Sequence, residues 1–141
     1  MKRDSVRVKG ELWMRVNGVL VRHVRNLIVD TGLAFLRSRM LDATSDVMSH
    51  MAIGSGSAPA AAGDTALGSE IARDTFDSIT PLGSQVTYIT TFPTAPAYAN
   101  IAEAGIFNAG VAGTMLNRVV FDAFTKEAGD ILEATWVIDF Q

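Results

Sequence analysis

Residues 131–140, ILEATWVIDF, alternate between two sets of side chains in the pattern of a half-buried β-strand. One face of this strand carries Leu132, Ala134, Trp136, Ile138 and Phe140. Two further strand-like segments precede it at Ile101–Asn108 and Met115–Phe124, and turn-forming residues separate all three. We therefore expect a three-stranded C-terminal meander, against whose apolar inner face the earlier strands pack.

Length and composition indicate one folded domain. A chain of 141 residues suits a single core, and 48% hydrophobic against 19% charged residues excludes disorder. No apolar run approaches the roughly 20 residues of a membrane span, and the N-terminus lacks the apolar segment of a signal peptide, so we expect a soluble chain without membrane contact. The absence of cysteine excludes disulfides, thiolate nucleophiles and Cys-based zinc sites.

Charge divides the chain unevenly. Residues 1–39 hold nine Lys/Arg against three Asp/Glu, whereas residues 40–141 hold three against twelve, and the net charge is −3. Such asymmetry is found in nucleic-acid-binding arms and also in faces that dock proteins. The basic residues alternate with strand formers and form neither a continuous basic tract nor a recognition helix, so we expect a protein partner rather than a nucleic acid.

A β-hairpin is expected over residues 6–25, because Asn17-Gly18 strongly favours a type I′ turn between two alternating segments. We divide the single domain 1–141 into this basic N-terminal hairpin (residues 1–25) and a sandwich body (residues 26–141). The hairpin is the predicted docking face, either for a shell protein or for the acidic remainder of an adjacent copy. Its candidate interface residues are Arg7, Lys9, Trp13, Arg15, Arg22 and Arg25.

The body begins with a helix predicted at residues 31–41, with Asp30 as its N-cap. A strand at Val47–Ile53 follows, and then a small, flexible surface loop at residues 54–63. Asp64 is expected to cap a short helical turn that ends at Leu67.

Another hairpin is expected to join Asp74–Ile79 to Val86–Phe92, and residues 95–100 lead from it into the C-terminal strands. The total is seven to nine strands and one helix with no alternation of strands and helices. This pattern predicts an all-β fold, a single antiparallel β-sandwich with one short helix.

No group of residues indicates a reaction centre. His23 and His50 lack acidic partners at metal-ligand spacing, and Gly54-Ser55-Gly56 resembles a nucleotide-binding turn in which Pro59 replaces the third glycine. An acidic run lacks the spacing of a calcium loop; its members are Asp64, Glu70, Asp74 and Asp77. We expect a protein that is not an enzyme, with no catalytic, cofactor-binding or metal-ligating residues and no cofactor.

Three sets of motifs resemble a family of small structural proteins of tailed-bacteriophage virions, described as capsid cement (decoration) proteins or as tail-fibre and baseplate components. They are Asn26–Leu33, Met51–Gly56 with Ala62–Leu67, and Glu103–Asn108 with Gly129–Leu132. The resemblance covers residues 26–140 and implies a jelly-roll type of sandwich, a structural role without enzymatic activity, and a homo-oligomer, with a trimer favoured. Glu103 and Asn108 are interpreted as packing and turn residues rather than ligands.

These observations give a functional prediction: a capsid cement protein on the virion surface, assembled in the host cytoplasm and bound to the major capsid protein. The absence of a coiled coil or collagen-like repeat favours the cement role over a fibre. The alternative is an adaptor of the phage tail or baseplate, bound to tail proteins, because a basic docking face would serve that role equally well.

Overall fold

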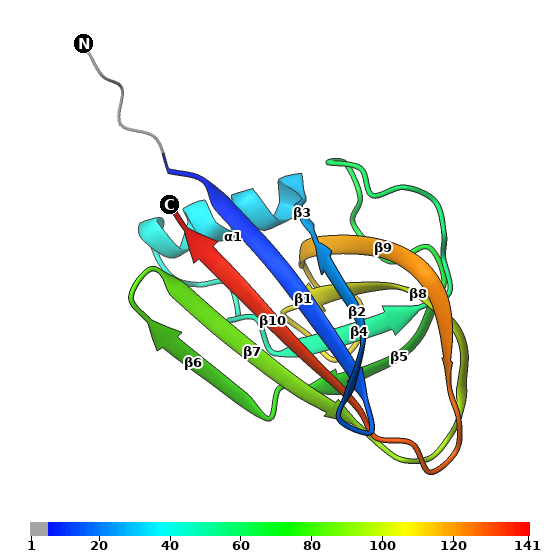
Figure 1. The fold of residues 1–141 in the computed structure, drawn as a ribbon. Helices are drawn as coiled ribbons and strands as arrows, with labels where there is room; N and C mark the ends of the chain where they lie inside the picture. The colour runs from blue at the N-terminus through cyan, green and yellow to red at the C-terminus, as the bar shows by residue number, and fades with distance from the viewer. Residues whose placement is uncertain (1–5) are drawn as a thin grey trace.

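The computed structural model describes residues 6–141, which form two antiparallel five-stranded sheets and one helix (Figure 1). The elements are, in chain order, β1 (Val8–Val16), β2 (Val19–Arg25), β3 (Leu27–Ile28), α1 (Asp30–Leu41), β4 (His50–Gly54), β5 (Glu70–Thr75), β6 (Ser78–Leu82), β7 (Gln85–Phe92), β8 (Tyr98–Phe107), β9 (Met115–Lys126) and β10 (Leu132–Phe140). The predicted all-β antiparallel sandwich with one short helix is confirmed. The described residues contain ten strands, rather than the seven to nine expected.

Sheet A has the strand order β2-β1-β10-β7-β6, and sheet B has the order β3-β9-β8-β4-β5. The two ends of the chain are interleaved, because β1 pairs along its whole length with β10, while β3 pairs with β9 in the opposite sheet. The N-terminal hairpin is therefore an integral part of sheet A. Residues 1–5, which belong to the predicted hairpin region, lie outside the described residues.

The predicted C-terminal meander is wrong in one respect. β8 and β9 form the expected pair in sheet B, but β10 leaves them and pairs with β1 and β7 in sheet A. Period-two alternation shows which face of a strand is buried, but it does not show which strand lies beside it. A short polar connection at residues 127–131 can cross between sheets as readily as it can close a hairpin.

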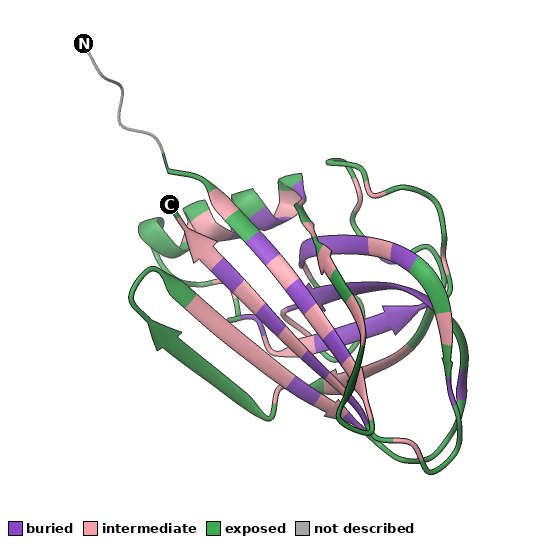
Figure 2. Ribbon diagram, in the orientation of Figure 1, coloured by how far each residue is buried: buried purple, intermediate pink, exposed green. Residues whose placement is uncertain are grey.

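The predicted hairpin from Asp74–Ile79 to Val86–Phe92 is also corrected. β5 pairs with β4 in sheet B, whereas β6 forms the hairpin with β7 in sheet A. The chain changes sheets at residues 76–77, inside the single strand predicted at Asp74–Ile79. Pro81 fits β6 because that strand lies at the edge of sheet A, and every residue of β6 is exposed (Figure 2).

The turn between β1 and β2 forms as predicted, with positive φ at both Asn17 and Gly18. The Asn17 side chain also fixes this turn to the connection before β10. Its amide donates to Asp130 at 2.9 Å, and its oxygen accepts the Ile131 backbone N–H at 2.9 Å. The turn residue therefore sets the register of the hairpin and holds the two ends of the chain together.

The main core lies between the sheets, and burial alternates along β1 and β10 (Figure 2). Leu132, Ala134 and Trp136 are fully buried, as the alternation predicted. A second apolar cluster lies on the opposite face of sheet B, because Ala52 alternates with core residues of β4; its members are Val29, Ala52, Leu67, Phe107 and Met115. Both faces of sheet B are therefore covered.

The helix α1 lies at one end of the sandwich and packs against β9 (Figure 1). The Gly32 backbone contacts the Leu116 carbonyl so closely that no side chain would fit there. Val29 is the N-cap, in place of the predicted Asp30. The Asp30 N–H donates instead to the Ala62 carbonyl at 2.8 Å, and its carboxylate lies in the first helical turn, where the helix dipole favours it.

Candidate docking surface

The outer face of sheet A is the broad face that points away from the core. It consists of polar, β-branched and aromatic side chains, none of which is buried. We define it by Lys9, Glu11, Trp13 and Arg15 on β1, His23 and Arg25 on β2, Gln85, Thr87, Ile89 and Thr91 on β7, and Glu133, Thr135, Val137 and Asp139 on β10. An open sheet face of this kind is suited to docking a large surface rather than to enclosing a small molecule.

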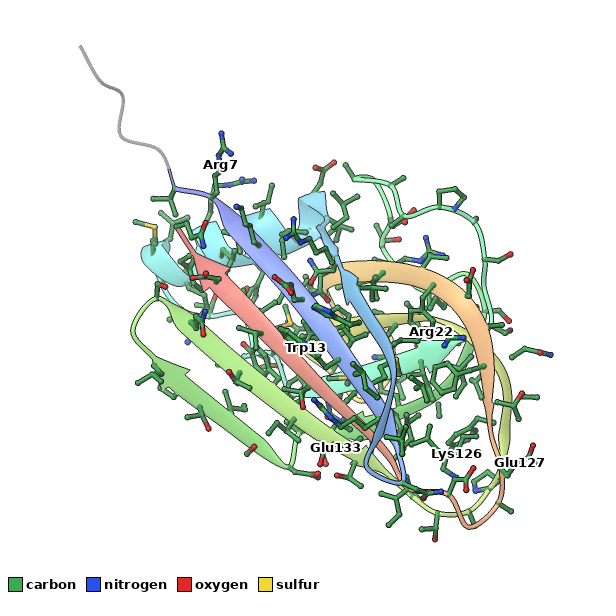
Figure 3. All side chains as sticks on the ribbon, in the orientation of Figure 1. Arg7, Trp13, Arg22, Lys126, Glu127 and Glu133 are labelled. Atoms are coloured by element: carbon green, nitrogen blue, oxygen red, sulfur yellow. The ribbon has the colours of Figure 1, made fainter. Side chains whose placement is uncertain are left out.

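Four of the six predicted interface residues share the outer face: Lys9, Trp13, Arg15 and Arg25. Arg7 precedes β1, is exposed, and accepts a backbone hydrogen bond from Gln141 at 2.8 Å, which extends the pairing of the two chain ends. Trp13 lies over the middle of sheet A, and Arg7 lies beyond the start of β1 (Figure 3).

Arg22 does not belong to the outer face, which corrects the prediction. A register shift in the hairpin pairs Arg22 with Met14, a residue of the core. Its guanidinium reaches β9, where Nε donates to the Asp122 carbonyl at 2.7 Å and the second terminal nitrogen donates to the Ala123 carbonyl at 3.0 Å. Arg22 therefore joins the two sheets at their open side, towards β9 (Figure 3).

The outer face is not simply basic, because β10 places carboxylates beside the basic residues of β1. Arg15 lies opposite Glu133 and Lys9 lies opposite Asp139 in the antiparallel register. The hydroxyl of Ser84, with Gln141 and the nearby Lys9, holds the pKa of Asp139 below its usual range. Sequence reasoning could not place these acids here, because it assigned β10 to a different group of strands.

An aromatic stack occupies the middle of the outer face. The Trp13 and His23 rings lie 4.6 Å apart at an interplanar angle of 12°, and His23 Nε2 contacts the Glu11 carboxylate at 2.7 Å. Trp13 is therefore covered on one side by its own hairpin. The residue is half-buried overall, and its exposed surface is available to a partner.

Beside this stack, a groove of about 610 Å³ opens where β1 begins. Its lining includes Lys9, Trp13, Arg25, Leu27, Leu33 and Asp139. The groove combines one tryptophan and two leucines with charges of both signs, a composition typical of the rim and centre of a protein interface.

A second notable cluster is internal: a carboxylate held by the loop between β4 and β5. Glu103 is fully buried and accepts the backbone N–H groups of Gly56, Gly68 and Ser69 at 2.6, 2.7 and 2.8 Å. A side chain at Gly56 would collide with this carboxylate. Gly56 of the Gly-Ser-Gly motif, together with Gly68 and Ser69, therefore binds an anion, and the anion is the protein's own Glu103.

Arg118 completes this cluster. Its guanidinium lies 3.1 Å from Glu103 and 3.0 Å from Asp64, and it is almost entirely buried. Asp64 also accepts the Ala61 N–H at 2.9 Å, and no helical turn forms there, so the predicted cap at Asp64 is wrong. The loop that composition predicted to be flexible is thus fixed to sheet B by charged hydrogen bonds.

The pKa values follow from these contacts. Burial alone would raise the pKa of Glu103, but the N–H groups of Gly68, Ser69 and Gly56 with Arg118 hold it below its usual range. The pKa of Asp64 is also lowered, chiefly by the Ala61 N–H and then by Arg118. Glu103 is consequently an ionised structural group, and its charge is fully occupied within the protein.

Two other basic side chains hold loops in a similar way. Arg73 donates to the carbonyls of Ala109 and Ala112 at 2.8 Å each, and its guanidinium lies 3.9 Å from the Phe107 ring centroid. Lys126 is fully buried, and its ammonium donates to three backbone carbonyls, those of Thr94, Pro96 and Glu127, at 2.9–3.2 Å. These cations stabilise the connections between strands.

The two histidines weighed in the sequence have different partners. His23 contacts Glu11, whereas His50 lies on β4 and contacts the Ser49 hydroxyl at 2.7 Å. Within residues 6–141, no three His, Cys, Asp or Glu side chains gather in a way that could hold a metal ion. The helix α1 is not long and apolar enough to cross a membrane.

Comparisons of the chain with protein-family models, curated protein sequences and solved structures found no match.

Proposed function

We propose that this protein is a non-enzymatic structural component of a bacteriophage virion, and specifically a cement protein that binds the capsid surface. The proposal is carried by one combined observation: paired strands form the outer face of sheet A, and buried charged side chains hold the loops of the same domain in place. A capsid-binding module must present a rigid surface, and preorganised loops lower the entropy lost on binding.

Two features support the assembly role. Three buried charged side chains contact backbone groups of loops: Glu103, Arg118 and Lys126. The outer face carries a central tryptophan with charged residues around it, a composition favoured in protein interfaces.

The agreement between the sandwich fold and the fold implied by the resemblance also supports the proposal. The major capsid protein is the proposed partner. An adaptor position in the tail is the competing assignment, and the same surface would serve it.

The proposal is tested by deleting the gene from the phage that encodes the chain. Heads that lack a cement protein are expected to assemble but to release DNA at a lower temperature than wild-type heads. Added purified protein is expected to bind such heads and restore their heat resistance. Heads of unchanged resistance that bind none of the added protein would refute the cement assignment, and particles without tails would favour the adaptor.

A further inference from the structure

The outer face of sheet A has a charge pattern that is complementary to itself. Along β1 the order is Lys9, Trp13, Arg15, and the residues opposite them on β10 are Asp139, Thr135 and Glu133. Each basic residue of β1 therefore has a carboxylate at the same height on β10. Strands β1 and β10 lie at the centre of sheet A, with β2 on one side and β7 and β6 on the other.

We propose that two copies of this chain associate through their outer faces, about a two-fold axis that runs along the strands midway between β1 and β10. This operation places β1 of one copy over β10 of the second copy at the same height. Arg15 of each copy then faces Glu133 of the other, and Lys9 faces Asp139. At the centre, the Trp13 side chain of each copy faces Thr135 of the other.

The charge pattern also selects the direction of the axis. A two-fold axis perpendicular to the strands, in the plane of the interface, would place β1 over β1. Arg15 would then face Lys9, and Glu133 would face Asp139, so that like charges meet. Only the axis along the strands places an opposite charge across from each of these four residues. Like charges that meet across an interface strongly disfavour association, so the perpendicular axis is excluded.

These charges are available for a partner. The ion pairs of the described residues involve Glu11, His23, Asp64, Glu70, Arg73, Glu103 and Arg118. Lys9, Arg15 and Glu133 form no ion pair within residues 6–141, although each lies next to an opposite charge across the β1–β10 ladder. A second copy would supply each of them with an additional opposite charge from above the sheet.

The size of the face fits a reversible dimer. On this axis β1 lies over β10 and β2 lies over β7, so four strands of each copy overlap and β6 has no strand opposite it. With strands about 4.8 Å apart and about 3.3 Å per residue, four strands cover roughly 19 by 27 Å, or about 500 Å² on each copy. The pair would bury about 1,000 Å² in total, which is at the lower limit for a specific interface. Two sheets packed face to face cross at about 30°, and the long side chains of Arg15 and Lys9 can span the resulting offset.

This inference goes beyond the proposed function, in which the same outer face binds the major capsid protein: the adjacent copy and the capsid protein are alternative partners of one face. The two-fold pair differs from the trimer implied by the resemblance. A chain bound to the capsid through this face has no outer face left for the pair, so the weak two-fold contact belongs to copies that are free in solution.

The test uses two charge-reversal variants: each should weaken the dimer on its own, and the two should associate with each other when mixed. Arg15→Glu gives a face in which residues 15 and 133 are both acidic, and Glu133→Arg gives one in which both are basic. Sedimentation velocity over a concentration series up to hundreds of micromolar should show a wild-type dimer of twice the 15.1 kDa chain mass. Each variant alone should dissociate at least about 10-fold more readily.

An equimolar mixture of the two variants should form a heterodimer, because residue 15 of each copy then faces an opposite charge at residue 133 of the other. Mixing cannot repair the like-charge pair within either chain, so this recovery reports contact between copies alone. Arg37→Glu, on the exposed side of α1, is the matched control and should leave the dimer intact. Circular dichroism confirms that each variant is folded.

A wild-type chain that remains monomeric, a trimeric mass, or a mixture that behaves like its separate components would each overturn this inference. None of these outcomes bears on whether the protein is found in virions, which particle composition measures independently.

Discussion

Replacing Glu103 with glutamine removes one charge and leaves the shape of the side chain almost unchanged. One carboxylate oxygen accepts the Gly56 and Ser69 N–H groups, and the other accepts the Gly68 N–H and Arg118. Glutamine has one oxygen and one NH₂ group, so in either orientation its NH₂ faces two donors. Losing a buried partner of this kind costs about 3–5 kcal/mol.

We expect a value near the lower end of that range, because Arg118 keeps its contact with Asp64 at 3.0 Å. A loss of about 3 kcal/mol is a large part of the 5–15 kcal/mol that stabilises a typical domain. In a protein of this size it should lower Tm by about 10 °C. Thermal and urea unfolding followed by far-UV circular dichroism measure both quantities.

The pH dependence gives a second readout of the same substitution. The folded-state pKa of Glu103 is depressed, so its contribution to the free energy of unfolding is complete above the unfolded value of about 4.5. That contribution is lost as the pH falls through the folded-state pKa. The difference in stability between wild type and Glu103→Gln should therefore be largest near pH 7 and shrink below about pH 4.5.

Glu133→Gln is the matched control, because it makes the same chemical change at a half-buried position on the outer face of sheet A. It should change stability by less than about 0.5 kcal/mol. If Glu103→Gln were as stable as this control, or if its deficit did not depend on pH, the carboxylate could not be holding the loop as described.

Other substitutions test the remaining contacts. Gly10→Ala should lower the free energy of unfolding, measured in urea, by about 2–3 kcal/mol, because the new methyl group collides with the Asn26 side chain, which accepts the Trp136 indole N–H. Gly63→Ala is its control: the added carbon meets nothing, so the change should be neutral or slightly stabilising. Arg22→Ala should lower the free energy of unfolding by about 1–2 kcal/mol through its hydrogen bonds to β9 while leaving self-association unchanged. A variant that lost association but kept its stability would contradict the assignment of Arg22 to the contact with β9.

Local patterns in the sequence predicted the elements of the fold well. The alternation in residues 131–140 identified β10 and its buried face, and Asn17-Gly18 identified the turn between β1 and β2. Both signals act over a few residues, because backbone sterics and side-chain alternation are local. The assignment of strands to sheets was less accurate, because the connections at residues 76–77 and 127–131 give no local sign that the chain crosses the sandwich.

For the functional residues too, local patterns did not show which side chains meet across neighbouring strands. Arg22 was placed on the docking face, but a bulge near Met14 and Arg15 shifts its register and turns it inward. The partner of Glu103 was missed, although a lone acid inside an apolar strand is itself a signal that a counter-charge lies nearby. Only three Lys or Arg residues follow residue 39, so the sequence offers few candidates for the counter-charge of Glu103. The register of β8 and β9 brings Arg118, rather than the other two, next to Glu103.

The central claim, that this chain is a cement protein of the capsid surface, is tested most directly by counting and locating its copies in purified virions. Quantitative mass spectrometry gives the ratio of this chain to the major capsid protein, and labelled antibodies seen by electron microscopy give its position. The proposal predicts on the order of hundreds of copies spread over the head, as the symmetry of a shell requires. On the order of ten copies confined to the tail, or no copies at all in the particle, would contradict it.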